Sequence, residues 1–87
     1  MRKERPVTLR PSKFKRSAEY DMLDTSQDFK VVGKHGWFHF IAFVQNHGGT
    51  EVWIDASDPR GLIRSIPLDK VKRDRKGAIE ARQHPQR

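Results

Sequence analysis

The histidines come nearest to a metal site by residue type and spacing. His35 and His39 lie four positions apart, a spacing that would place two imidazoles on one face of a helix. Here the spacing crosses a turn and enters a predicted strand, so the two rings do not share a face. No acidic third ligand lies near them in the sequence. We therefore predict no metal site, with His39 on a strand surface and His47 in a loop.

Carboxylates and one serine are the next candidates for chemistry. Asp55, Asp58 and Asp69 have the residue type that holds magnesium or acts in acid–base catalysis. Aspartates in turns usually accept hydrogen bonds from backbone N–H groups, which explains Asp58 before Pro59 and Asp69 in a short turn. Ser65 has no histidine at the spacing of a hydrolytic triad. The glycines are explained by turns, not by a phosphate-binding loop. We predict a protein that is not an enzyme and that uses no cofactor.

Length and composition limit the elements that hold these residues. The chain has 87 residues, of which 34% are hydrophobic, and no cysteine. This is enough for one small domain, and the lack of cysteine excludes a zinc ribbon and a disulfide scaffold. No apolar run approaches the roughly 20 residues of a membrane span, and the N-terminus lacks the apolar stretch of a signal peptide. We expect a soluble, cytoplasmic protein that does not bind membranes.

Short strands separated by turn signals fill the middle of the chain. The predicted strands are 29–32, 37–45, 51–56, 62–66 and 72–73, with one 3₁₀ turn over 67–71. Strands without intervening helices indicate an all-β fold, here a small five-stranded SH3-like barrel. The alternative is a five-stranded OB-type barrel, which usually has a helix between its third and fourth strands, where residues 58–61 leave no room. The predicted core consists of Phe29, Val31, Phe38, Phe40, Val44, Val52, Ile54, Ile63, Ile66, Leu68 and Val71.

The predicted strand 37–45 is too apolar for a strand with one exposed face. Its sequence, WFHFIAFVQ, has aromatic or aliphatic residues on both faces. A long, strongly bent strand that changes its packing partner midway would explain this pattern. The register of the hairpin that follows is open, and a slip of one residue would exchange the faces of Trp53 and Ile54.

Composition divides the chain into four segments. Residues 1–16 are a basic N-terminal arm, and 17–28 are a short helix or turn around Ala18–Leu23 that docks on the body through Tyr20 and Leu23. Residues 29–73 form the barrel, and 74–87 are a basic C-terminal tail. In that tail AIEARQ has helical propensity but is too short to be stable alone.

The positive charge is concentrated in the two ends of the chain. The whole chain carries +7, divided as +6 in residues 1–16, −4 in 17–69 and +5 in 70–87. Cationic arms favour polyanions, because each phosphate that is neutralised releases condensed counterions. The predicted nucleic-acid-binding residues are Arg2, Lys3, Arg5, Arg10, Lys13, Lys15, Arg16, Lys70, Lys72, Arg73, Arg75 and Lys76.

Aromatic residues in two adjacent predicted strands suggest a second interaction surface. A small barrel has no room for both tryptophans, so part of this set faces outward. The predicted aromatic face consists of Trp37, His39, Phe43, Trp53 and Arg64. Exposed aromatics beside cations suit base stacking and equally suit a protein hot spot. The third interpretation is that the segment Tyr20–Leu23 covers them as a lid.

The middle of the chain also resembles known proteins. GWFHFIAFVQNHGGTEVWIDASD followed by GLIRSIPLDKVKR resembles small proteins of unknown function from actinobacterial phages, over Tyr20 to Arg73. In its order of strands and 3₁₀ turn it is similar to SH3-like modules of the Tudor and KOW type, which include RNA, DNA and protein binders. The first resemblance implies a phage source and a bacterial host. Neither implies a specific activity, since the KOW glycine signature and a complete methyl-lysine cage are not identified.

Two functions follow from these patterns. In the first, the protein binds DNA or RNA, with basic arms on phosphates and little base specificity. In the second, it is a phage-encoded module that binds a bacterial host protein through the barrel face. The first is preferred because the cationic arms are the largest departure from an average soluble domain.

Overall fold

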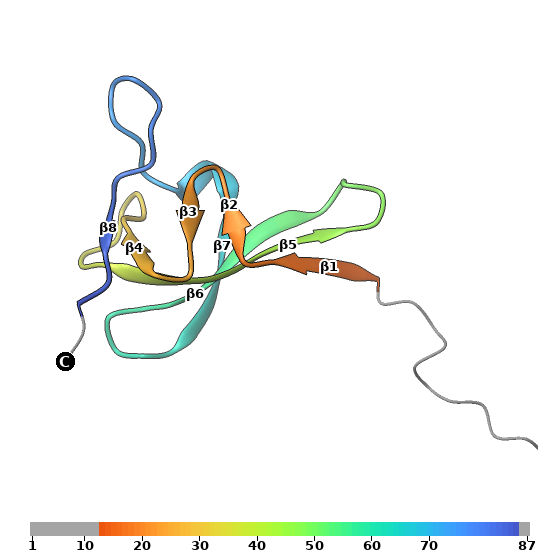
Figure 1. Ribbon diagram of the computed structural model, residues 1–87, viewed down its shortest axis with the longest axis horizontal. Coiled ribbons are helices and arrows are strands. Elements are labelled where there is room, and N and C mark those ends of the chain that lie inside the picture. The colour runs from red at the N-terminus through yellow and green to blue at the C-terminus, as the bar shows by residue number, and fades with distance from the viewer. Residues whose placement is uncertain (1–12, 86–87) are drawn as a thin grey trace, which may run out of the picture.

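The computed structural model describes residues 13–85 of the chain. Figure 1 shows strands joined by short loops, with one short 3₁₀ turn. The elements are β1 (Phe14–Ser17), β2 (Glu19–Tyr20), β3 (Leu23–Asp24), β4 (Gln27–Phe29), β5 (Phe38–Asn46), β6 (Val52–Ser57), β7 (Ile63–Pro67), η2 (Leu68–Lys70) and β8 (Ala81–Gln83). The predicted all-β class and the 3₁₀ turn are confirmed. Within this part of the chain, no helix has the length and apolarity needed to cross a membrane.

One antiparallel sheet forms the body of the protein. Its strand order is β7-β6-β5-β4-β8, and β1 pairs with the far half of β5. The sheet curls into a half-barrel, which agrees with the prediction of a small all-β barrel (Figure 1). Residues Val31 and Val71 form a bridge that joins the chain after β4 to the chain after η2. The predicted fifth strand at 72–73 is wrong: Arg73 forms only an isolated bridge with Ile79, and the sheet is extended instead by β8 and β1.

The longest strand, β5, is buried on both faces because its register changes midway. Phe40 pairs with Ala56, and a shift between Phe40 and Ala42 then brings Phe43 opposite Ile54. Cross-strand partners share a face, so Phe43 takes over the core side after the shift and Ala42 turns away from it. The extra residue of a β-bulge bends a strand and produces this exchange. The predicted change of packing partner within the strand is confirmed.

The core lies inside the curl of the sheet. Eight of the predicted core residues are buried: Phe29, Val31, Phe38, Phe40, Val44, Ile54, Ile66 and Val71. Leu68 packs partly buried against the core cluster, and Val52 is half-buried. Ile63 was expected in the core but is 63% exposed, because β7 is the edge strand and Ile63 stands at its start.

The helix expected around Ala18–Leu23 is a β-hairpin. β2 and β3 pair directly, and the two residues between them, Asp21 and Met22, have φ angles of 49° and 71°. Left-handed φ at both turn positions matches the twist of a tight hairpin, which overrides the weak helical propensity of so short a segment. The docking prediction holds, because Leu23 is buried and the Tyr20 ring stacks on Phe43 at 4.6 Å between centroids.

The sheet extends beyond the predicted barrel boundaries of 29–73 at both ends. Phe14–Ser17 of the predicted arm pairs with β5 as β1, and Ala81–Gln83 of the predicted tail pairs with β4 as β8. The helical propensity of AIEARQ is thus overridden by sheet pairing. Pairing with the hydrogen-bonding edge of β4 stabilises these three residues more than a helical turn would, because so short a helix does not nucleate.

Candidate functional site

The predicted aromatic face is not one continuous surface. Phe43 is covered by Tyr20 of the β2–β3 hairpin. Trp53 meets Phe14 of β1 edge to face at 5.2 Å, and its indole N–H donates to Asp55 Oδ1 at 2.7 Å. The lid interpretation is therefore confirmed for Phe43. Phe14 and Trp53 form a second aromatic pair that the sequence did not predict.

Trp37 lies apart from these pairs and is surrounded by cations. It is half-buried and directly precedes β5. Lys30 Nζ lies 4.9 Å from the Trp37 ring centroid, and Arg82 Cζ of β8 lies 4.5 Å from it. Both distances are within the range of cation–π attraction. Trp37 is thus the member of the predicted aromatic face that lies beside positive charge.

Four lysines from two parts of the chain lie close together, and one of them, Lys30, contacts Trp37. The Val32 N–H donates to the Lys70 carbonyl at 2.8 Å, and the Lys72 N–H donates to the Lys30 carbonyl at 2.9 Å. This pairing places Lys30 and Lys72 next to each other. With Lys34 they line a shallow hollow of about 360 Å³, and Lys34 and Lys70 line a neighbouring groove. We call Lys30, Lys34, Lys70 and Lys72 the lysine cluster.

The structure separates the other predicted phosphate contacts into two groups. Lys13, Lys15 and Arg16 lie at β1, and Arg73, Arg75 and Lys76 lie at the loop before β8. Figure 1 places β1 and this loop at opposite ends of the molecule. The remaining predicted contacts, Arg2, Lys3, Arg5 and Arg10, lie outside the described residues.

Two of these arginines bind carboxylates of the protein itself. Arg16 donates to Asp55 Oδ2 at 2.9 Å, and Arg73 donates to Asp21 Oδ2 at 2.8 Å. The hydrogen bond to Asp21 raises the pKa of Arg73 above its ordinary value. These guanidinium groups are less available to phosphates than the lysines, because a ligand would have to compete with an existing ion pair.

The acidic residues of the body are largely compensated by internal partners. Asp58 Oδ1 accepts the backbone N–H groups of Arg60 and Leu62, each at 2.9 Å, which confirms its predicted role in the turn. Arg64 of the predicted aromatic face donates to Asp58 Oδ2 at 3.1 Å. The hydrogen bond from the Leu62 N–H lowers the pKa of Asp58 most, and Arg64 lowers it further. Together they outweigh burial, which raises the pKa, and leave it below its ordinary value. Asp58 therefore contributes little uncompensated negative charge to the surface.

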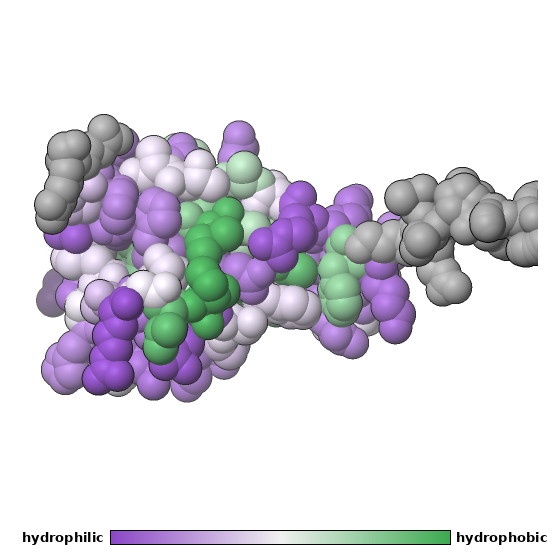
Figure 2. All heavy atoms as spheres, turned by 90° about the horizontal axis from the view of Figure 1, so that it is seen from below, coloured by the Kyte–Doolittle hydropathy of each residue, from purple (hydrophilic) through white to green (hydrophobic). Residues whose placement is uncertain are grey.

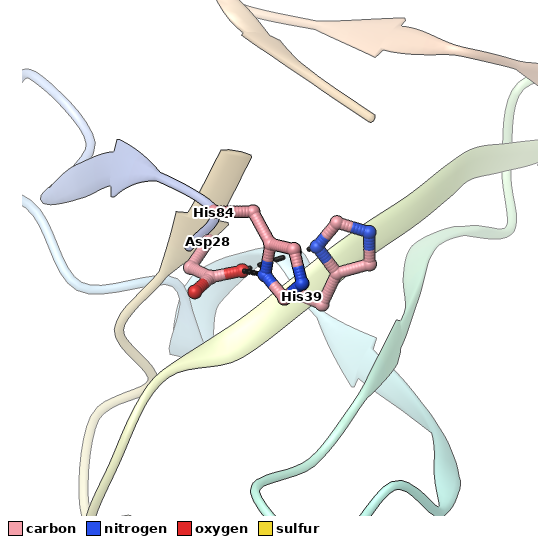
Figure 3. A group of neighbouring side chains, drawn as sticks. All are labelled: Asp28, His39 and His84. Atoms are coloured by element: carbon pink, nitrogen blue, oxygen red, sulfur yellow. Dashed lines mark hydrogen bonds and ion pairs between the residues drawn. The ribbon is translucent and has the colours of Figure 1, made fainter. Parts of the chain in front are cut away.

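A cluster of Asp28, His39 and His84 was not predicted. Figure 3 shows both imidazoles directed at the Asp28 carboxylate. His39 Nδ1 lies 3.0 Å and His84 Nδ1 2.7 Å from Asp28 Oδ1, while Arg82 binds the other carboxylate oxygen at 3.1 Å. Burial raises the pKa of Asp28, but the hydrogen bonds from His84, His39 and Arg82 outweigh it and leave the pKa below its ordinary value.

Sequence spacing carries no signal for this cluster. His39 and His84 stand 11 and 56 positions from Asp28, and the strands that join them were not all predicted. His39 was expected on a strand surface, and it is half-buried there, but its partner is not His35.

Comparison with other proteins adds no family to these observations. The chain matches no protein-family model, and the searches of curated proteins and of solved structures found no match. The resemblance to small phage proteins stays a prediction.

Proposed function

We propose that this protein is a non-enzymatic nucleic-acid-binding protein whose phosphate contacts centre on the lysine cluster. The observation that carries the proposal is the convergence of these lysines around two neighbouring hollows, with Lys30 also placed on the half-buried ring of Trp37. Cations that track a phosphate backbone next to an aromatic platform are typical of sites that bind single strands. Lys70 and Lys72 belong to the contacts predicted from the sequence, and Lys30 and Lys34 are added by the fold.

In the described part of the chain, the lysine cluster differs from several arginines in that its charges are not paired with carboxylates. Among residues 13–85, the arginines in ion pairs are Arg16, Arg64, Arg73 and Arg82, while His39 and His84 are hydrogen-bonded to Asp28. In the same part of the chain none of the four lysines is paired with a carboxylate, and the ammonium group of Lys30 lies over the Trp37 ring. The internal pairing of Asp21, Asp55 and Asp58 also weakens the repulsion that an acidic body would exert on phosphates. We propose that this binding takes place in the cytoplasm of a bacterial host.

The test is a salt series with matched double variants. Binding of the full chain to a labelled single strand of DNA, the same strand of RNA and a DNA duplex is measured by fluorescence anisotropy from low to above-physiological salt. The Lys30→Gln/Lys72→Gln variant removes two charges from the cluster, and Lys13→Gln/Lys15→Gln removes two from β1. Loss of two phosphate contacts lowers the log–log slope by about 1.4 for a single strand and about 1.8 for a duplex.

Comparison of the two variants distinguishes binding at the lysine cluster from binding that depends only on the net charge of the protein. We expect the cluster variant to show the full loss of slope and the β1 variant a smaller one. Equal losses would mean that net charge alone governs binding, and the cluster would not be the site. Absence of binding near physiological salt would refute the function as a whole.

A second candidate function, docking on a host protein, is favoured by the exposed apolar side of β7. Leu62 is 52% and Ile63 63% exposed beside a groove of about 1150 Å³. In the described part of the chain β7 pairs with β6 alone and ends the sheet, so its free edge could accept a partner strand. Figure 2 shows a strip of hydrophobic residues running between hydrophilic side chains on one face. Ile63→Ser should abolish capture of the host partner from a lysate and leave nucleic-acid binding unchanged.

A further inference from the structure

The cluster of Asp28, His39 and His84 has the composition of a metal site. One carboxylate and two imidazoles each offer a ligand atom, and these atoms lie within 4.8 Å of one another. The three residues come from β4, from β5 and from the chain just after β8. We propose that they form a binding site for a divalent transition-metal ion of the Zn²⁺ type, which neither the sequence analysis nor the proposed function includes.

Two of the three distances between ligand atoms are near those of a tetrahedral site. Zinc binds imidazole nitrogen and carboxylate oxygen at about 2.0–2.1 Å, which places two ligand atoms about 3.3 Å apart around a tetrahedral ion. Asp28 Oδ1 lies 2.7 Å from His84 Nδ1 and 3.0 Å from His39 Nδ1. The first separation would have to grow by about 0.6 Å and the second by about 0.3 Å. Side-chain rotation is sufficient for such a change, since both histidines are partly exposed.

Asp28 is prepared to act as a ligand through one oxygen. Its side chain is 4% exposed, so its orientation is fixed by the sheet around it. Arg82 donates to Oδ2 and leaves Oδ1 directed at the two imidazoles. A hydrogen-bonded second oxygen is the usual support of a ligating carboxylate. The Arg82 charge opposes a cation, but its contact with the Trp37 ring keeps it on the far oxygen.

Room for further ligands lies directly beside the cluster. A hollow of about 480 Å³ is lined by Asp28, His39 and His84 together with Trp37 and Ser57. Zinc with three protein ligands completes its coordination with water or a substrate atom. The hollow is large enough for water, and it opens the fourth position to solvent.

Metal binding requires a change in where the imidazole protons sit. In the absence of metal each Nδ1 carries the proton that it donates to Asp28 Oδ1, because an ionised carboxylate only accepts. For binding, a neutral ring moves this proton to Nε2, which can donate to water from the exposed ring, and Nδ1 coordinates through its lone pair. An imidazolium ring would release one proton. Neutral histidine and deprotonated carboxylate are the forms that metals bind.

The site would connect strands that are otherwise weakly joined. β8 has three residues and pairs with β4 alone among the described strands. A metal held by β4, β5 and His84 would attach the end of the chain to the body, so that binding is coupled to folding. Ligand bound only to the native state raises the melting temperature, by roughly 10 °C or more at a hundredfold excess over Kd.

The experiment titrates the full chain, purified without a histidine tag, with Zn²⁺ in competition with a chromophoric chelator. Melting temperature is measured in parallel with Zn²⁺, with Mg²⁺ and with EDTA. The variants are His84→Gln and His39→Gln, and the matched control is His47→Gln in the exposed β5–β6 hairpin loop. Circular dichroism establishes that each variant is folded.

We expect one Zn²⁺ per chain, a rise in melting temperature with Zn²⁺ but not with Mg²⁺, and at least a tenfold loss of affinity in both cluster variants. His47→Gln should bind as the wild type does. No binding, or binding that survives both cluster variants, would overturn the proposal. These outcomes do not depend on nucleic-acid binding, which is measured separately.

Discussion

Replacing Asp28 by asparagine should strongly destabilise the metal-free protein. The buried carboxylate accepts hydrogen bonds from His84, His39 and Arg82 on its two oxygens. An asparagine offers a single oxygen, so its amide N–H₂ must face either the imidazoles or the guanidinium as a second donor. Hydrogen bonds to charged groups contribute about 1.5–3 kcal/mol each, and an unsatisfied buried group costs about 1–3 kcal/mol.

Partial exposure of the donors reduces this loss. The side chains of His84 and Arg82 are 45% and 41% exposed and can bind water when the carboxylate is gone. We therefore expect the equivalent of one charged hydrogen bond to be lost, about 2–3 kcal/mol. For a domain of this size the melting temperature should fall by roughly 10–20 °C.

Urea unfolding of the full chain in EDTA measures this difference, with Asp69→Asn as the control. Asp69 is exposed in η2, so the control removes the same charge and should change stability by no more than about 0.5 kcal/mol. A loss for Asp28→Asn as small as that of the control would refute the account of the carboxylate as a buried acceptor.

The pH dependence provides an independent check on the same residue. The pKa of Asp28 is lowered in the folded protein from its ordinary value of 3.8. Its contribution is therefore fully present above pH 3.8 and is lost as the pH falls through the folded pKa. The difference between wild type and Asp28→Asn should be present down to about pH 4 and should shrink below it. A difference that persists unchanged in acid would contradict this assignment.

Three further substitutions test the turn at Gly33–Gly36 and the β2–β3 hairpin. Gly36→Ala should destabilise more than Gly33→Ala: both glycines have positive φ, but a Cβ on Gly36 would lie 2.6 Å from a proline ring carbon, whereas Gly33 has open space. Both variants should lose about 1–2 kcal/mol for the left-handed conformation, and equal losses in thermal unfolding would rule out the contact with the proline. Tyr20→Leu keeps an apolar side chain but removes the ring stacked on Phe43. It should cost about 0.5–1.5 kcal/mol, and an unchanged unfolding midpoint would show that the hairpin is not held by this pair.

The sequence predicts the fold best where a pattern has one structural solution. Apolar residues on both faces of 37–45 required a strand that changes its packing side, and the register shift between Phe40 and Ala42 provides it. The turn at Asp58–Gly61 was also predictable, because a side-chain acceptor before a proline closes a turn locally. Both predictions depend on neighbours in sequence.

Predictions failed where the structure of a short segment is determined by its pairing with a segment far away in the sequence. Ala81–Gln83 has no strand pattern, and it becomes β8 because the edge of β4 is available to pair with it. The β2–β3 hairpin likewise depends on Leu23 and Tyr20 finding the core and Phe43. In such short segments, helix propensity contributes less free energy of folding than the burial of one apolar side chain.

The candidate site was missed for a related reason. Charge counted along the chain gives residues 17–69 a net charge of −4, and this count treats a buried aspartate as the equal of an exposed lysine. In the folded protein Asp28 is directed inward, and Asp55 and Asp58 are held by arginines. Lys30 and Lys34 belong to the same segment, and they lie beside Lys70 and Lys72 at the surface. The body of the protein can therefore present a cationic face of its own. Deleting residues 1–12, which leaves β1 and β8 in the sheet, should weaken nucleic-acid binding without abolishing it.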